Sequence, residues 1–196
     1  MYGKERKYIR YTHFSLESLT LHSCSFIETK VFNFGALKEV SLGWMEVRLS
    51  AIKALLSNCN MLESLSFKRC WNSDKFDLGE EKHMGLTQLV LDQCGFDFDY
   101  FKVNAPNLKI FKYCGWMNFD LIEIDSLAME EIDLDFSLVI STGSEQLHME
   151  PDMDVRHSIM KMALQHNEFS RISLFLNSCP MLERLTIELV KLDKNG

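Results

Sequence analysis

The chain has 196 residues, a mass of 22.8 kDa and a formal net charge of -7, and 46% of its residues are hydrophobic against 25% charged. This composition excludes wholesale disorder, and only three prolines and nine glycines exclude a collagen-like or linker-rich chain. The acidic balance gives no general attraction to phosphate backbones, so nucleic acid is not an expected partner. No apolar stretch in the sequence is long enough to span a bilayer or to follow the basic start as a signal peptide, so we expect no membrane association and a cytoplasmic or nuclear location.

A nine-residue frame recurs along most of the chain. Residues 16–24 read LESLTLHSC, residues 62–70 read LESLSFKRC, and residues 86–94 read LTQLVLDQC. Their shared pattern, L-x-x-L-x-L-x-x-C, is the strand part of a leucine-rich repeat. Weaker copies begin at residues 37, 108, 129 and 182, so successive frames start 21, 25, 24, 22, 21 and 53 residues apart. The last interval indicates an irregular repeat or an insertion.

The frame predicts an α/β fold, a leucine-rich-repeat solenoid of about six to seven repeats. The fourth and sixth residues of each frame alternate on one face of a short strand and enter the core, as does the first residue. Parallel strands then line the concave face, and helices or irregular turns form the convex face. We expect a basic linker or remnant at residues 1–13, a single repeat domain at residues 14–190 and a tail at residues 191–196. Because Tyr11 and Phe14 would make a poor polar cap, we also expect the isolated chain to be aggregation-prone or only marginally stable.

Two convex segments and one insertion are predicted between the strands. Apolar residues spaced along 49–59 predict a helix capped by Ser50, and those along 169–179 predict a second helix, although FSRISLFLN there also fits a strand. Residues 137–156 have the composition of an acidic, polar, exposed insertion. A further helix is predicted to follow, with these residues facing inward: Val155, Ile159, Met162 and Ala163.

The six cysteines fit the repeat better than they fit a metal or catalytic site. Three occupy the ninth position of a frame, whereas Cys59 and Cys179 each lie three residues before a frame-opening leucine. Cys114 has no such assignment. The sequence contains no C-x-x-C pair of the kind that zinc sites use. We therefore expect reduced, structural thiols, no metal and no cofactor.

Outward positions of the strands are the candidates for binding a partner, because repeat arrays bind through their concave surface. The candidates are Thr20, His22, Ser41, Ser66, Lys68, Val90, Asp92, Lys112, Glu131, Asp133, Asp135 and Thr186. Residues 117–154 hold eleven acidic residues and no Lys or Arg. The acidic residues at 130, 131, 133 and 135 form either a patch that steers a basic partner or only a solubilising surface. The three tryptophans fall at or just beyond the ends of frames, where they either pack at the turn or serve as exposed binding anchors.

The amino-acid sequences of the repeats resemble those of one known family. The segments FGALKEVSLGW, APNLKIFKY and SCPMLERLTIEL, together with the C-x-x-L-E-x-L strands, are similar to the repeat region of plant F-box/leucine-rich-repeat proteins, including those that end in an FBD domain. The resemblance covers roughly residues 14–190. It implies a protein-protein interaction module that recognises the substrate of a cullin-based ubiquitin ligase. An F-box upstream of such repeats, where one exists, docks on the adaptor subunit of the ligase.

No L-P-x-x-(I/L)-L segment precedes Leu16, so we expect the F-box to be absent from this sequence. The alternative is a stand-alone or truncated repeat scaffold without ubiquitin-ligase docking. An enzyme is not expected, because the sequence has no glycine-rich phosphate loop, nucleophile elbow or H-E-x-x-H motif. The expected partner is an unknown protein, joined by a ubiquitin-ligase adaptor only if an upstream F-box exists.

Overall fold

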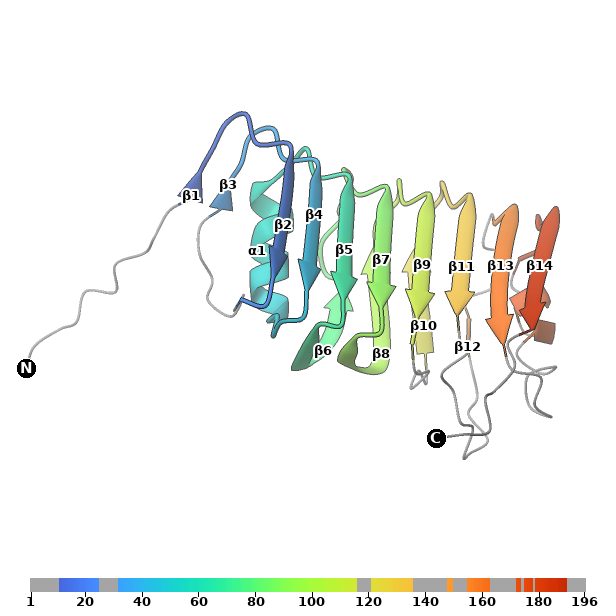
Figure 1. Ribbon diagram of the computed structural model, residues 1–196. Helices are drawn as coiled ribbons and strands as arrows, with labels where there is room; N and C mark the ends of the chain where they lie inside the picture. The colour runs from blue at the N-terminus through green and yellow to red at the C-terminus, as the bar shows by residue number, and fades with distance from the viewer. Residues whose placement is uncertain are drawn as a thin grey trace, which may run out of the picture.

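The computed structural model describes residues 11–24, 32–115, 121–135, 148–149, 155–162, 172–173, 175–177 and 179–189. Its principal element is a sheet of eight parallel strands, called the main sheet below (Figure 1). In chain order these strands are β2 (Ser18–His22), β4 (Glu39–Gly43), β5 (Ser64–Lys68), β7 (Gln88–Asp92), β9 (Ile110–Cys114), β11 (Glu131–Asp135), β13 (His157–Met162) and β14 (Arg184–Leu189). Neighbours in this sequence are also neighbours in the sheet. The predicted solenoid of parallel strands is therefore confirmed.

Each of the seven frames read from the sequence forms one strand of the main sheet, in a common register. Leu65 in β5 pairs with Leu89 in β7, and Leu89 pairs with Phe111 in β9. From β4 to β13 the fourth and sixth frame residues are buried, and in β5 they are Leu65 and Phe67, both with 0% exposure. In the end strands β2 and β14 these positions are only partly buried or exposed. Phe67 packs edge-on against Phe76 at 6.1 Å between ring centroids. Because the strands stay in register, each repeat adds one layer to a continuous apolar core.

The eighth strand, β13, replaces the helix that the sequence predicted after the insertion. That prediction was wrong, because Val155, Ser158 and Met160 are buried at the first, fourth and sixth positions of an unrecognised frame. Ser158 stands where the other frames have an apolar residue, which hid the pattern. The frame divides the long interval into spacings of 26 and 27 residues, close to the others.

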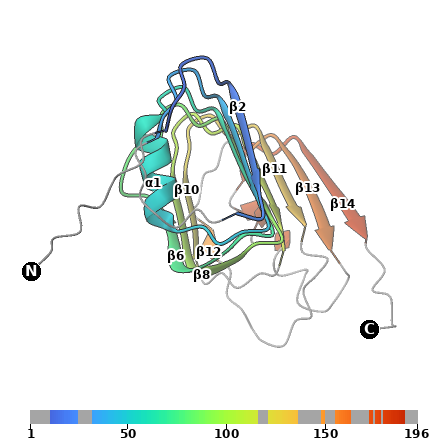
Figure 2. The same cartoon turned by 60° about the vertical axis from the view of Figure 1, so that its left-hand side comes forward.

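The side of the solenoid behind the main sheet is formed largely by a second parallel sheet, as Figure 2 shows. Its strands are β6 (Trp71–Leu78), β8 (Gly95–Asn104), β10 (Leu121–Asp125) and β12 (His148–Met149). β12 lies inside the predicted polar insertion, most of which falls outside the described residues. A small two-stranded sheet of β1 (Tyr11–Thr12) and β3 (Phe32–Asn33) lies near the N-terminus.

One long helix, α1 (Leu49–Asn58), completes this side and contacts β6. Its inward residues Ala51, Ile52 and Leu55 are buried, as the apolar stripe predicted. The predicted cap was wrong, because the helix begins two residues earlier than a cap at Ser50 requires: Arg48 is the N-cap and makes no side-chain capping bond. Residues 172–173 and 175–177 are helical, in agreement with the helix preferred for that segment.

The chain turns sharply where the main-sheet strands end. The eighth frame residue has a left-handed backbone, with φ between 48° and 55°, at Ser23, Trp44, Arg69 and Gln93. This conformation aims each N–H group at the carbonyl that ends the next strand, as from Arg69 to Asp92 at 2.7 Å and from Trp44 to Lys68 at 2.9 Å. The corners therefore continue the hydrogen-bonding of the sheet for one further residue.

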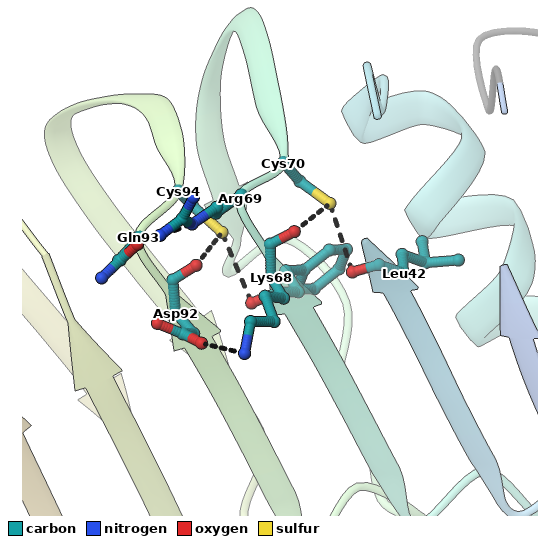
Figure 3. A network of polar contacts seen from close by, with 8 residues as sticks. Leu42, Lys68, Arg69, Cys70, Asp92, Gln93 and Cys94 are labelled. Atoms are coloured by element: carbon teal, nitrogen blue, oxygen red, sulfur yellow. Dashed lines mark hydrogen bonds and ion pairs between the residues drawn. The ribbon is translucent and has the colours of Figure 1, made fainter. Parts of the chain in front are cut away.

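The ninth frame residue then folds beneath the strands. The Cys70 thiol donates to the carbonyl oxygen of Leu42 at 3.3 Å, and the Cys94 thiol donates to that of Phe67 at 3.5 Å (Figure 3). Burial raises the pKa of Cys94 to about 12, so this thiol keeps its proton at neutral pH. All six cysteines are free; of the three at the ninth position, Cys70 and Cys94 are buried and Cys24 is exposed.

Candidate protein-binding face

The side chains of the main sheet that point away from the core form a single surface, called the outer face below. It is the face that the sequence predicted as concave. All twelve predicted binding residues lie on it, at alternate positions of β2, β4, β5, β7, β9, β11 and β14. Figures 1 and 2 show no described helix or strand in front of these strands. The pairing register sorts the outer face into three rows that cross all eight strands.

Small hydroxyl side chains occupy the N-terminal half of this face. In the middle row, Thr20, Ser41 and Ser66 are successive neighbours across β2, β4 and β5. Val90 continues the row in β7. In the row nearest the strand ends, the ring of His22 lies against Gly43, where an added Cβ would meet its Cδ2 atom at 2.8 Å. This half is thus flat and lightly polar, so an approaching backbone can come close to the strands.

Charged side chains occupy the C-terminal half. Lys112 in β9 pairs with Glu131 in β11 at 2.6 Å. A similar pair in the N-terminal half joins Lys68 in β5 to Asp92 in β7 at 3.3 Å. Because each pair joins neighbouring strands, the charges are fixed relative to the sheet. Glu130, just outside the strand, pairs with Lys109 at 2.9 Å. The acidic cluster read from the sequence is therefore interleaved with lysines from the preceding repeat.

Asp133 lies at the centre of this charged half. Lys112 is its neighbour on β9, and Ile159 is its neighbour on β13. Its Oδ1 atom is buried and has no hydrogen-bond partner. Burial raises the pKa of Asp133, although the ammonium groups of Lys161 and Lys112 act in the opposite direction. Because the unpaired oxygen is the buried one, it is not presented at the surface of the outer face.

Cys114, which had no assignment from the sequence, lies on the outer face between Asp92 and Asp135. Burial, followed by repulsion from Asp135 and Asp92, raises the pKa of this thiol to about 11. The protonated thiol is a poor nucleophile at neutral pH. Burial also raises the pKa of Cys59, Cys70, Cys94 and Cys179.

The sequence missed the contribution of β13 to the outer face. His157, Ile159 and Lys161 project from this strand at the outward positions, between β11 and β14. They bring an apolar residue and a second lysine beside the acidic strand β11. The signal that would have found them is the 53-residue interval between the last two frames, which is about two repeats long. A frame starting at Val155 divides this interval into two repeats of ordinary length.

Within the described part of the chain, no cluster of three or more histidine, cysteine or acidic side chains is arranged to hold a metal ion. No helix there is both long and apolar enough to cross a membrane.

These features define a leucine-rich-repeat solenoid, a scaffold that presents a continuous strand surface for contact with other proteins. The family model described as "At1g61320/AtMIF1, LRR domain" matches residues 9–153, and the chain belongs to this family. Its fold and repeat content thereby agree with the resemblance drawn from the sequence.

Several curated relatives are plant F-box proteins. The chain is 29% identical over 216 residues to the putative F-box protein At3g29830 of Arabidopsis thaliana, covering 90% of this chain and 45% of the relative. It is 27% identical over 222 residues to the putative F-box/LRR-repeat protein At1g56400 of the same plant, covering 91% of this chain and 44% of the relative. The chain thus spans less than half the length of these relatives. No solved structure matches it significantly.

Proposed function

We propose that this chain is a substrate-recognition module of the F-box/leucine-rich-repeat type, which binds a protein partner through the outer face of the main sheet. The observation that carries the proposal is the outer face itself. It runs across eight strands in one register, with hydroxyl side chains at one end and interleaved charges at the other. A rigid surface of this size, free of any described covering element, suits recognition better than chemistry.

The names of the curated relatives support the ubiquitin-ligase part of the proposal. In the full-length protein, an F-box would dock on the ligase adaptor while the outer face holds the substrate. No catalytic step is part of the proposal. Burial raises the pKa of Cys94 and Cys114, which makes these two thiols poor nucleophiles at neutral pH. The alternative is a stand-alone scaffold that uses the same outer face and delivers nothing to a ligase.

The test is a comparison of two serine-to-arginine variants in plant cells. Ser66→Arg places a long cation in the middle of the outer face, whereas Ser50→Arg places the same side chain at an exposed position of α1. Proteins captured by tagged full-length protein and identified by mass spectrometry should include a set lost in Ser66→Arg and kept in Ser50→Arg. Unchanged capture by Ser66→Arg would exclude the outer face as the binding surface.

The same experiment separates the two versions of the function. Co-capture of a ligase adaptor, unaffected by Ser66→Arg, supports the F-box version. Capture of the partner set without any adaptor supports the stand-alone scaffold.

A further inference from the structure

A second exposed surface lies at the corners, beyond the ends of the main-sheet strands. Trp44, Arg69 and Gln93 occupy the eighth frame position of three successive repeats. We call these three residues the corner ridge. They lie outside the outer face, whose residues belong to the strands themselves, and the proposed function does not use them.

The corner ridge is held together by contacts between repeats. The guanidinium carbon of Arg69 lies over the Trp44 ring, 4.4 Å from its centroid. Arg69 Nε donates to Gln93 Oε1 at 2.7 Å. The stacking and the hydrogen bond together fix the plane of the guanidinium group.

This arrangement leaves only hydrogen-bond donors for a ligand. No described residue accepts from the two terminal nitrogens of Arg69, which form the end of the guanidinium fork. Because Gln93 uses its oxygen to accept from Arg69, its amide nitrogen lies on the other side, as Figure 3 shows. The planar pair of donors on the Arg69 fork matches a carboxylate group.

The backbone of the corner ridge also adopts a conformation that is unfavourable for the residue types found there. Trp44 has φ of 55° and Arg69 has φ of 48°, a region that glycine and asparagine occupy at lower cost. The same conformation at Ser23 and Gln93 shows that the corner hydrogen bonds impose it, so the choice of tryptophan and arginine here has another reason. Trp44 keeps 46% exposure and the nearby Trp71 keeps 50%, although large aromatic side chains usually seek burial. Tryptophan and arginine are also the residue types that carry most binding energy at protein interfaces.

We propose that the corner ridge binds an acidic, extended segment of a protein partner, with a carboxylate on the Arg69 fork and an apolar side chain against Trp44. The neighbouring Lys68 is already paired with Asp92 at 3.3 Å, so it does not add a second cation of the kind that a phosphate backbone would need. One guanidinium group suits one carboxylate, whereas a phosphate backbone needs a row of cations.

The test uses the immobilised full chain and a displayed library of random linear peptides. Wild-type protein should recover peptides enriched in Asp and Glu next to apolar residues. Arg69→Asn removes the charge and keeps a residue that tolerates the left-handed corner, so this variant should fold. It should bind the recovered peptides about tenfold more weakly or worse, the loss expected for one charged hydrogen-bonding group. Arg69→Lys keeps the charge without the fork and should lose a large part of the affinity.

Two control variants locate the binding. Arg156→Asn removes an equally exposed arginine at the opposite ends of the strands, and Ser66→Arg obstructs the outer face. Both should keep wild-type affinity for the recovered peptides, and circular dichroism should show all four variants folded. The proposal is overturned if wild-type protein recovers no acid-rich peptides, or if Arg69→Asn binds the recovered peptides as tightly as wild type does. It is also overturned if Arg156→Asn lowers the affinity for these peptides as much as Arg69→Asn does. Loss of binding in Ser66→Arg alone would also overturn it, while leaving the proposed outer-face function intact.

Discussion

Replacement of Ser158 by alanine should stabilise the protein, although it removes a native side-chain group. Ser158 has 1% exposure, and its hydroxyl oxygen is buried without a hydrogen-bond partner. It occupies the fourth frame position, where the neighbouring strands β11 and β14 carry Ile132 and Leu185. The hydroxyl therefore loses its hydration on folding and gains no bond in return.

The expected gain follows from two opposing contributions. An unpaired buried hydroxyl costs about 1–3 kcal/mol relative to one that stays hydrated or paired. Removing the oxygen leaves a small void, which takes back part of this gain, of the order of 1 kcal/mol at most. We expect Ser158→Ala to raise the free energy of unfolding by about 1 kcal/mol, and the melting temperature by roughly 2–4 °C for a chain of this size.

Urea unfolding, monitored by circular dichroism, measures this difference. Ser66→Ala is the matched control, because Ser66 occupies an outward position where the change should stay within about 0.5 kcal/mol. A rise in the midpoint at unchanged slope is the expected result for Ser158→Ala. A variant less stable than wild type would refute the reasoning, since it would show that the hydroxyl has a partner in solution, such as a buried water.

Three further outcomes are expected. Ellman's reagent at pH 8 should label exposed Cys24 quickly and buried Cys94 only as fast as the protein opens; equal rates would contradict the ninth-position packing. Burial raises the pKa of Asp133 above its ordinary 3.8, so the folded state binds its proton more tightly, and stability falls as pH rises from that value through the raised pKa. Asp133→Asn should therefore gain stability relative to wild type as pH rises across this window, and a pH-independent difference in urea midpoints would contradict the shift. On the last strand, Ile187 is 41% and Leu189 is 60% exposed, so the isolated chain should self-associate, as measured by light scattering. Lysine at both positions should reduce this self-association, and a monomeric wild type would show that this strand edge does not cause it.

The strands of the main sheet could be predicted because their core residues are constant in spacing and type. The second sheet could not, since its buried residues lack a steady period. In β8, Phe96, Phe101 and Val103 are buried, and the five-residue step between the first two breaks the alternation of a regular strand. The pairing of β6 with β8 contains register shifts at the same level. Without a period of two, extended chain on the convex side cannot be told from a loop.

The two candidate binding surfaces also differ in how far the sequence predicts them. The outer face follows from alternation alone, so the sequence located Thr20, Lys112 and Asp133 correctly on it. Of the corner ridge, the sequence offered only the tryptophan as a possible anchor, because left-handed corners are usually marked by glycine or asparagine, and here tryptophan, arginine and glutamine occupy them. Only the structure shows that these three residues touch.

Core and contact positions are separate within the central frames, and this separation limits what relatives reveal. In the frames that open at Leu37, Leu62 and Leu86, the first, fourth, sixth and ninth residues are buried, whereas the third, fifth, seventh and eighth residues face outward or lie at the corners. Substitutions at the outward positions leave the core unchanged, so they alter recognition at little cost in stability. A relative that shares 29% identity over 90% of the chain can therefore keep the same solenoid and bind a different protein. It follows that a partner found for one relative is informative here only if the two chains also match at the outer face and the corner ridge.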